Sequence, residues 1–100
     1  MSFAPDWLVP DWPAPSNVRA VHTTRGGGHS SGLHASLNLG DHVDDAPAAV
    51  QANRAVLADA LGVRPVFLRQ VHGHDLAVLS GDAPDGTTAD ACMSLGTGLA

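Results

Sequence analysis

The sequence contains no lysine, no glutamate and no tyrosine, and its charged side chains are five arginines and ten aspartates. The formal net charge of −5 gives a surface that does not attract a phosphate backbone, which argues against general nucleic-acid binding. A small anionic or neutral ligand held by one or two arginines is compatible with this balance. A GC-rich coding bias also explains the preference for aspartate, arginine and alanine, so composition alone selects no ligand.

Cysteine is nearly absent as well. Cys92 is the one thiol, so no internal disulfide can form, which fits a reducing cytoplasm. No basic residue adjoins it in the sequence to activate it, and we expect a buried structural thiol. The first 15 residues lack the basic and apolar regions of a signal peptide, and no stretch approaches the ~18 apolar residues of a membrane span. We expect a soluble, cytoplasmic protein.

The chain is short and poor in aromatic residues, with 100 residues, two Phe and two Trp, and its hydrophobic fraction is 44%. It fits one domain or a part of one, with a core built from alanine and short aliphatic side chains. Residues 95–100 end on an apolar pair directly after Gly-Thr-Gly, whereas natural termini are usually polar. We therefore expect residues 1–100 to be the N-terminal portion of a single, longer domain.

A helix and several strands are expected, which indicates a mixed α+β fold. Residues 5–15 are rich in proline and predict an extended arm whose two tryptophans cover a hydrophobic surface. Residues 25–44 are rich in Gly, Ser and His and predict a long ordered loop, the first place to look for a site. Apolar alternation and short apolar runs predict strands at residues 18–24, 66–71, 76–79 and 89–95.

The clearest element is a helix over residues 45–62. Asp44 or Asp45 can cap the helix, Pro47 suits its first turn, and Gly62 suits a left-handed terminator. Its apolar face is expected to contain Val50, Leu57 and Leu61, with Asn53 and Ala60 nearby.

Six histidines are present, but none stands in a strong metal-binding spacing. His72 and His74 form an i, i+2 pair around a glycine, and there is neither His-x-x-x-His nor Cys-x-x-Cys. A surface or hydrogen-bonded histidine is the alternative for each. His72 directly follows a predicted strand. The end of a strand is a common place for site residues, because the backbone is rigid there and the side chain is accessible. His72 is the residue whose context most favours chemistry.

Three other polar residues are candidate ligand contacts. Arg25 precedes three glycines, and together they could cradle an anion, although an ordinary glycine-rich turn is the alternative and no P-loop pattern is present. Asn38, between two leucines, either contacts a ligand or satisfies the loop's own backbone. Gln70 ends an otherwise apolar strand, two residues before His72.

Several segments together resemble the start of the YfiH-like family, also called the laccase-domain or polyphenol oxidase family. Residues 24–40 resemble its Thr-Arg-x-Gly-Gly … Ser-Leu-Asn-Leu-Gly loop, Asn53-Arg54 its Asn-Arg, residues 70–73 its Gln-Val-His-Gly, and residues 89–91 its Ala-Asp-Ala. Each motif is weak by itself. Their order and spacing agree over nearly the whole chain, and jointly they are specific.

The resemblance implies a mixed α/β sandwich related to the catalytic domain of cytotoxic necrotizing factor, of which the N-terminal part is present here. It implies a zinc bound by His72, then by a Cys in a downstream Ala-Asp-Cys and a His in His-Ala-Gly-Trp-Arg-Gly, both beyond residue 100. Family members are described as purine nucleoside enzymes that phosphorolyse adenosine, inosine and methylthioadenosine and deaminate adenosine. Others are described as copper-dependent laccases or as a peptidoglycan editing factor.

Carried onto this sequence, the resemblance makes His72 the catalytic residue and first zinc ligand. We add Arg25 as a phosphate contact, with Asn38 and Gln70 as contacts for base or ribose. The expected protein is a zinc-dependent enzyme acting on purine nucleoside and phosphate, with no nucleic-acid or membrane partner. Residues 1–100 are expected to be inactive alone, because two of the three ligands lie outside them.

A copper-dependent polyphenol oxidase is the rival enzyme. Multicopper sites need many histidines, and the pair of His72 and His74 is too little for one. His29 and His34 stand where relatives carry other residues, so they inherit no role. Cys92 falls just after Ala-Asp-Ala and is not the expected zinc thiolate.

Overall fold

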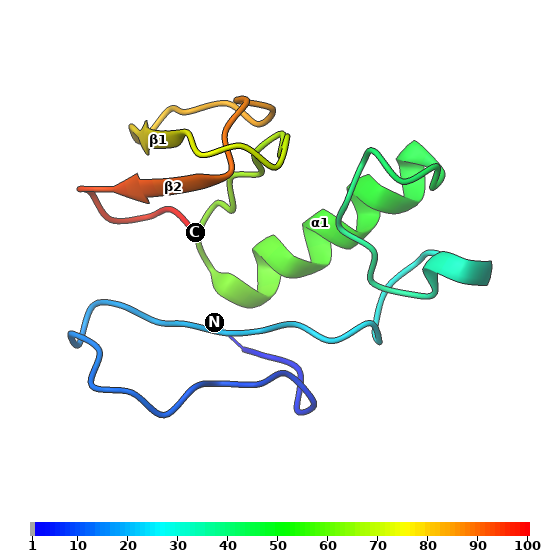
Figure 1. Ribbon diagram of the computed structural model, residues 1–100. Helices are drawn as coiled ribbons and strands as arrows, with labels where there is room; N and C mark the ends of the chain where they lie inside the picture. The colour runs from blue at the N-terminus through cyan, green and yellow to red at the C-terminus, as the bar shows by residue number, and fades with distance from the viewer. Residues whose placement is uncertain (1) are drawn as a thin grey trace. The chain divides into compact units, whose positions relative to one another are not determined.

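A computed structural model describes residues 2–100 and divides the chain into two units, Met1–Ala60 and Leu61–Ala100. The elements in chain order are the short 3₁₀ helix η1 (Gly32–His34), helix α1 (Pro47–Leu61), and strands β1 (Leu76–Leu79) and β2 (Ala91–Ser94) (Figure 1). This combination confirms the expected mixture of α and β structure. Among the described residues, no helix is both long enough and apolar enough to cross a bilayer.

The N-terminal arm of the first unit runs out and returns alongside itself (Figure 1). Leu8 and His22 exchange two backbone hydrogen bonds of 2.9 and 2.8 Å and form one antiparallel bridge. Beyond this bridge the predicted strand over 18–24 is wrong, because the facing proline-rich segment lacks N–H donors for a longer ladder. Trp7 is 7% exposed and has the predicted covering role, whereas Trp12 is 49% exposed.

Helix α1 lies within the predicted range 45–62, starting two residues later and ending one residue earlier. Pro47 is its first residue. Gly62, directly after its last residue, has a φ of +70°, a left-handed conformation that glycine adopts without a Cβ penalty. The predicted inner face is confirmed, because Val50, Asn53 and Leu57 are buried and Leu61 is half-buried at the helix end.

In the second unit, β1 and β2 form a parallel two-stranded sheet (Figure 1). The register runs from Leu76 opposite Ala91 to Leu79 opposite Ser94. Both strands lie within the predicted ranges, so these two predictions are confirmed.

The predicted strand over 66–71 is wrong. Within this range the chain makes one isolated bridge, at Arg69 opposite Thr88. The N–H groups of Phe67 and Val71 donate to aspartate carboxylates instead of to a neighbouring strand. A side-chain acceptor satisfies the backbone locally but cannot propagate a ladder.

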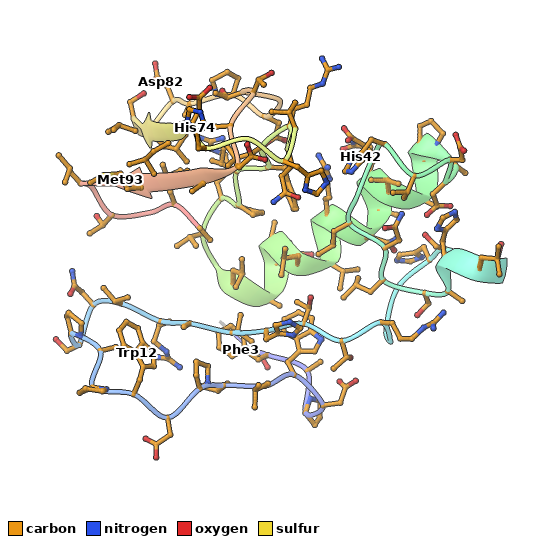
Figure 2. All side chains as sticks on the ribbon, in the orientation of Figure 1. Phe3, Trp12, His42, His74, Asp82 and Met93 are labelled. Carbon is orange, nitrogen blue, oxygen red and sulfur yellow. The ribbon has the colours of Figure 1, made fainter. Side chains whose placement is uncertain are left out.

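Cys92 lies on β2 and is exposed, which corrects the expectation of a buried thiol. All four β2 residues are exposed, and Met93 is 41% exposed (Figure 2). The buried apolar residues of this unit are Leu79, Ala83 and Ala89. Such small side chains cannot cover both faces of a sheet, so the thiol stays in contact with water.

Candidate functional site

The residues predicted to carry function fall in both units. Arg25 and Asn38 belong to Met1–Ala60, and they lie on the wall of one hollow. Gln70 and His72 belong to Leu61–Ala100, where they are exposed on one turn.

Arg25 is oriented by the loop that it begins. Its Nε donates to the carbonyl oxygen of Ala35 at 2.8 Å. Across residues 2–100, neither terminal guanidinium nitrogen donates a hydrogen bond, and neither do the N–H groups of Gly26 and Gly27. The Asp6 carboxylate lies on the Gly26 side, where it accepts the Thr24 hydroxyl at 2.5 Å. The loop therefore presents donors that suit an anion arriving from the side away from Asp6.

The third glycine of the run has a different role. A Cβ at Gly28 would lie 2.2 Å from the carbonyl oxygen of Ser36 and 2.6 Å from Oδ1 of Asn53, so no side chain fits there. Its N–H donates to Oγ of Ser36 at 3.0 Å. Packing therefore requires Gly28, which lets the two branches of the loop approach each other and α1 closely.

Asn53 holds this loop from helix α1. The residue is 0% exposed. Its Oδ1 accepts the N–H of His29 at 2.6 Å, and its Nδ2 donates to Oγ of Ser30 at 2.8 Å and to the carbonyl oxygen of Asn38 at 2.7 Å. Each bond crosses from the helix to the loop, so the amide joins the two loop branches to one rigid element.

Arg54 strengthens the same attachment, since its Nε donates to the carbonyl oxygen of Leu39 at 2.9 Å. The sequence matched Asn53 and Arg54 to a family motif but gave neither a role. One signal was available for Asn53. It is a polar residue at helical spacing on the apolar face between Val50 and Leu57, and a buried amide there must find partners.

An open hollow of about 250 Å³ lies beside the loop. Its wall is formed by Arg25, Leu33, His34, Ala35, Leu37 and Asn38. The Asn38 amide is already engaged. Its Nδ2 donates to the Gly40 carbonyl at 3.0 Å and to Oδ2 of Asp45 at 3.1 Å, and its Oδ1 accepts the Gly40 N–H at 3.1 Å. Asn38 thus satisfies its own loop, and Oδ1 keeps one lone pair for a ligand.

Asp45 completes the polar cluster at the entry to α1. Its carboxylate accepts the Ser30 hydroxyl, the Asn38 amide and the N–H of Ala46, the last at 2.8 Å. The hydrogen bond from Ser30, and then that from Asn38, lower the pKa of Asp45 below its ordinary value against an opposing desolvation. The predicted capping carboxylate is present, and its backbone partner is the residue just before the helix. Figure 2 shows His42 on the same segment leading into α1.

His72 lies on an exposed turn with an unusual backbone. Its φ is +57°, the left-handed region that few residues other than glycine adopt. The N–H groups of Val71, His72 and Gly73 all donate to the Asp90 carboxylate, at 3.0, 2.7 and 2.6 Å. Within the described residues the His72 ring makes no hydrogen bond, so its nitrogens are open to a ligand. Backbone strain of this kind concentrates at functional sites.

The described residues supply a metal ligand but no complete set. Over residues 2–100, no three His, Cys, Asp or Glu side chains gather closely enough to hold an ion. The His74 side chain is 99% exposed and lies on the turn before β1 (Figure 2). Gln70, also exposed, makes no side-chain hydrogen bond in this part of the chain. An open imidazole on an anchored turn fits zinc, which takes histidine nitrogen readily.

A family model described as multi-copper polyphenol oxidoreductase laccase matches residues 19–100. A purine nucleoside phosphorylase of Pseudomonas aeruginosa is 51% identical over 94 residues, covering 94% of this chain and 38% of that protein. Purine nucleoside phosphorylase YfiH of Escherichia coli is 45% identical over 89 residues, covering 87% of this chain and 37% of that protein. The chain thus spans less than two fifths of the length of these relatives.

Two solved structures share the fold. YlmD from Geobacillus stearothermophilus has a TM-score of 0.86 at 30% identity, covering 99% of this chain and 41% of that chain. A protein from Neisseria meningitidis has a TM-score of 0.71 at 42% identity, covering 81% of this chain and 35% of that chain. The α/β arrangement described above is therefore found in experimental structures.

Proposed function

The chain belongs to the multi-copper polyphenol oxidoreductase laccase family, which includes the YfiH-like proteins, and on that premise we propose that the full-length protein is a purine nucleoside phosphorylase. Such an enzyme transfers the sugar of a purine nucleoside to inorganic phosphate and releases the base. Relatives that carry this name, at 45 and 51% identity, support the proposal.

The orientation of Arg25 is the observation in this chain that carries the proposal. The Nε bond to Ala35 fixes the plane of the guanidinium, and the terminal nitrogens remain available to an anion. A fixed guanidinium fork matches the geometry of phosphate, and little side-chain freedom is lost when the anion binds. The N–H groups of Gly26 and Gly27, which have no hydrogen-bond partner among residues 2–100, add donors of the kind that line phosphate sites.

The nucleoside contacts are assigned to two side-chain amides, one from each unit. Asn38 shares the hollow with Arg25 and would accept one hydrogen bond from base or ribose through Oδ1. Gln70 would contribute a second amide from the turn that carries His72. The hollow itself has polar side chains on its wall that can orient a sugar.

We assign zinc as the metal and His72 as one of its ligands and as the catalytic residue in this chain. When bound, zinc would supply a Lewis acid that lowers the pKa of water, as adenosine deamination requires. The part played by His72 is to hold the metal through an open ring nitrogen on an anchored turn. Deamination is thus a second activity of the same proposed site, and a relation to the cytotoxic necrotizing factor domain stays a prediction.

The proposal is tested with the full-length protein, by phosphate-dependent release of hypoxanthine from inosine together with zinc and copper analysis. We expect stoichiometric zinc and turnover, both lost in His72→Ala. His74→Ala is the matched control, because it removes a neighbouring exposed histidine and should keep both. Stoichiometric copper with oxidation of polyphenols and no nucleoside turnover would establish the rival enzyme instead.

A further inference from the structure

We propose that Asp90 is a positioning residue, which holds the turn 71–73 in the conformation that presents the His72 ring to the metal. This inference rests on the proposed function, because it gives the turn a purpose only if His72 is a ligand. It assigns to the Ala-Asp-Ala segment a role that the sequence did not indicate.

The geometry is that of an anion nest whose anion is a side chain of the protein itself. Oδ1 of Asp90 accepts the N–H groups of Val71 and His72, and Oδ2 accepts that of Gly73. Three consecutive N–H groups converge on one point when the residue between them is left-handed. The φ of +57° at His72 and the carboxylate therefore belong together. Without the anion the converging N–H dipoles would repel one another, and the chain would relax toward negative φ.

Asp90 is itself well anchored. The preceding residue, Ala89, is 1% exposed, and its N–H donates to the carbonyl of Arg69 at 3.2 Å. The N–H of Asp90 donates to the carbonyl of Asp75 at 3.2 Å, and β2 begins at the next residue. The Asp90 carboxylate thus attaches the His72 turn to the start of strand β2. A ligand held by a rigid element binds a metal better than one on a free loop.

The contacts of Asp90 fit this role, because its carboxylate oxygens are engaged by backbone N–H groups of the turn. Asp90 acts on the His72 backbone and leaves the ring free.

The test uses full-length Asp90→Asn and Asp90→Ala, with Asp85→Asn as control. Asp85 also accepts a backbone N–H in the second unit, that of Phe67, which lies outside the turn 71–73. Asparagine can keep the two bonds to Oδ1 and places an NH₂ against the Gly73 N–H, whereas alanine removes all three. Zinc affinity is measured by chelator competition, and amide hydrogen exchange at residues 71–73 is measured on metal-free protein.

We expect zinc to bind about 10- to 100-fold more weakly in Asp90→Ala, with a smaller loss in Asp90→Asn. Exchange at residues 71–73 should accelerate in the same order, with little change in the rest of the protein. The control should keep the zinc affinity of the wild type. Zinc affinity within twofold of the wild type in Asp90→Ala, or unchanged exchange at residues 71–73, overturns the positioning role.

His72→Ala distinguishes a failure of the ligand assignment from a failure of the positioning role. If it loses zinc while Asp90→Ala keeps it, the proposed ligand stands and the positioning role falls. If His72→Ala retains zinc at wild-type affinity, the ligand assignment falls and the role of Asp90 falls with it.

Discussion

The side-chain Oδ1 of Asn53, on helix α1, accepts the backbone N–H of His29 at 2.6 Å across 24 positions of sequence. The same amide donates to Ser30 and to the carbonyl of Asn38. One buried side chain therefore fixes the shape of the loop on which Arg25 stands. Asn53 thus belongs to the buried face of α1 and also determines the conformation of a loop far away in the sequence.

Asn53→Ala should destabilise the protein strongly. The change leaves the His29 N–H and the Asn38 carbonyl without their side-chain partner and removes one of the two hydrogen bonds of the Ser30 hydroxyl, at a position where Asn53 is 0% exposed. We expect a loss of about 3 kcal/mol in the free energy of unfolding, measured by urea denaturation. Gln51→Ala, on the exposed side of the same helix, is the control and should cost under about 0.5 kcal/mol. Equal effects of the two changes would contradict the attachment described here.

Gly28→Ala should be among the least tolerated changes in the loop. The new Cβ would overlap the Ser36 carbonyl at 2.2 Å, and a backbone atom cannot move aside cheaply. We expect a loss of about 3 kcal/mol or more, or failure to fold. Gly81→Ala is the comparison, because its Cβ meets nothing within 4 Å. Its effect on the thermal midpoint should be small.

His72→Gly should stabilise the metal-free protein relative to His72→Ala. At a φ of +57° a residue with a Cβ is strained, and glycine is not. We expect a difference of about 1 kcal/mol in the free energy of unfolding. Neither variant should bind zinc at the proposed site. A more stable alanine variant would show that the turn does not hold its left-handed conformation in solution.

Arg25→Ala should raise the KM for phosphate in the full-length protein by one to two orders of magnitude, because a charge-assisted pair contributes about 1.5–3 kcal/mol. Arg25→Lys should recover little of this, since a single ammonium cannot keep the Ala35 bond and bind the anion as a fork. Arg19→Ala serves as the control, because that guanidinium lies over the Phe3 ring, at 5.9 Å from its centroid. An unchanged phosphate KM in Arg25→Ala would remove Arg25 from the anion site.

Asp45 should make stability depend on acidity. Its folded-state pKa is lowered, so its stabilising effect is complete at pH well above the ordinary value of 3.8 and is lost as pH falls through the folded-state value. We expect the stability difference between wild type and Asp45→Asn to be constant from about pH 5 to 7 and to shrink below about pH 4. Asp59→Asn, on the exposed side of α1, controls for removing a charge. A difference that grows in acid would contradict the assignment.

The sequence predicted best what local chemistry determines. Helix α1 has a proline in its first turn, a glycine after its last residue and apolar residues at helical spacing. All three signals lie within one short stretch of sequence. The strand predicted over 66–71 failed because the N–H groups of Phe67 and Val71 find carboxylates 18 and 19 positions away. The pattern of apolar residues within a segment cannot show such partners, because they lie far away in the sequence.

The candidate site likewise contains residues that the sequence singled out and residues that it did not. Arg25, Asn38, Gln70 and His72 were selected by residue type and motif, and their ligand roles stay predictions. Asn53 and Asp90 were present in matched motifs but received no role, because their importance lies in bonds to distant backbone. A buried polar residue must form hydrogen bonds, but the sequence does not say with which atoms. The structure was needed to identify these partners.

The parallel pairing of β1 with β2 has a further consequence for His72. In a parallel pair both strands start at the same end, so the residue that enters β2 arrives beside the turn that enters β1. A slip of one position in the pairing would carry the Asp90 carboxylate about 3.3 Å along the sheet and turn it to the other face. It would then lie out of reach of the three N–H groups. The conformation at His72 is therefore a local indicator of strand alignment, and correct assembly of the sheet would have to precede metal binding.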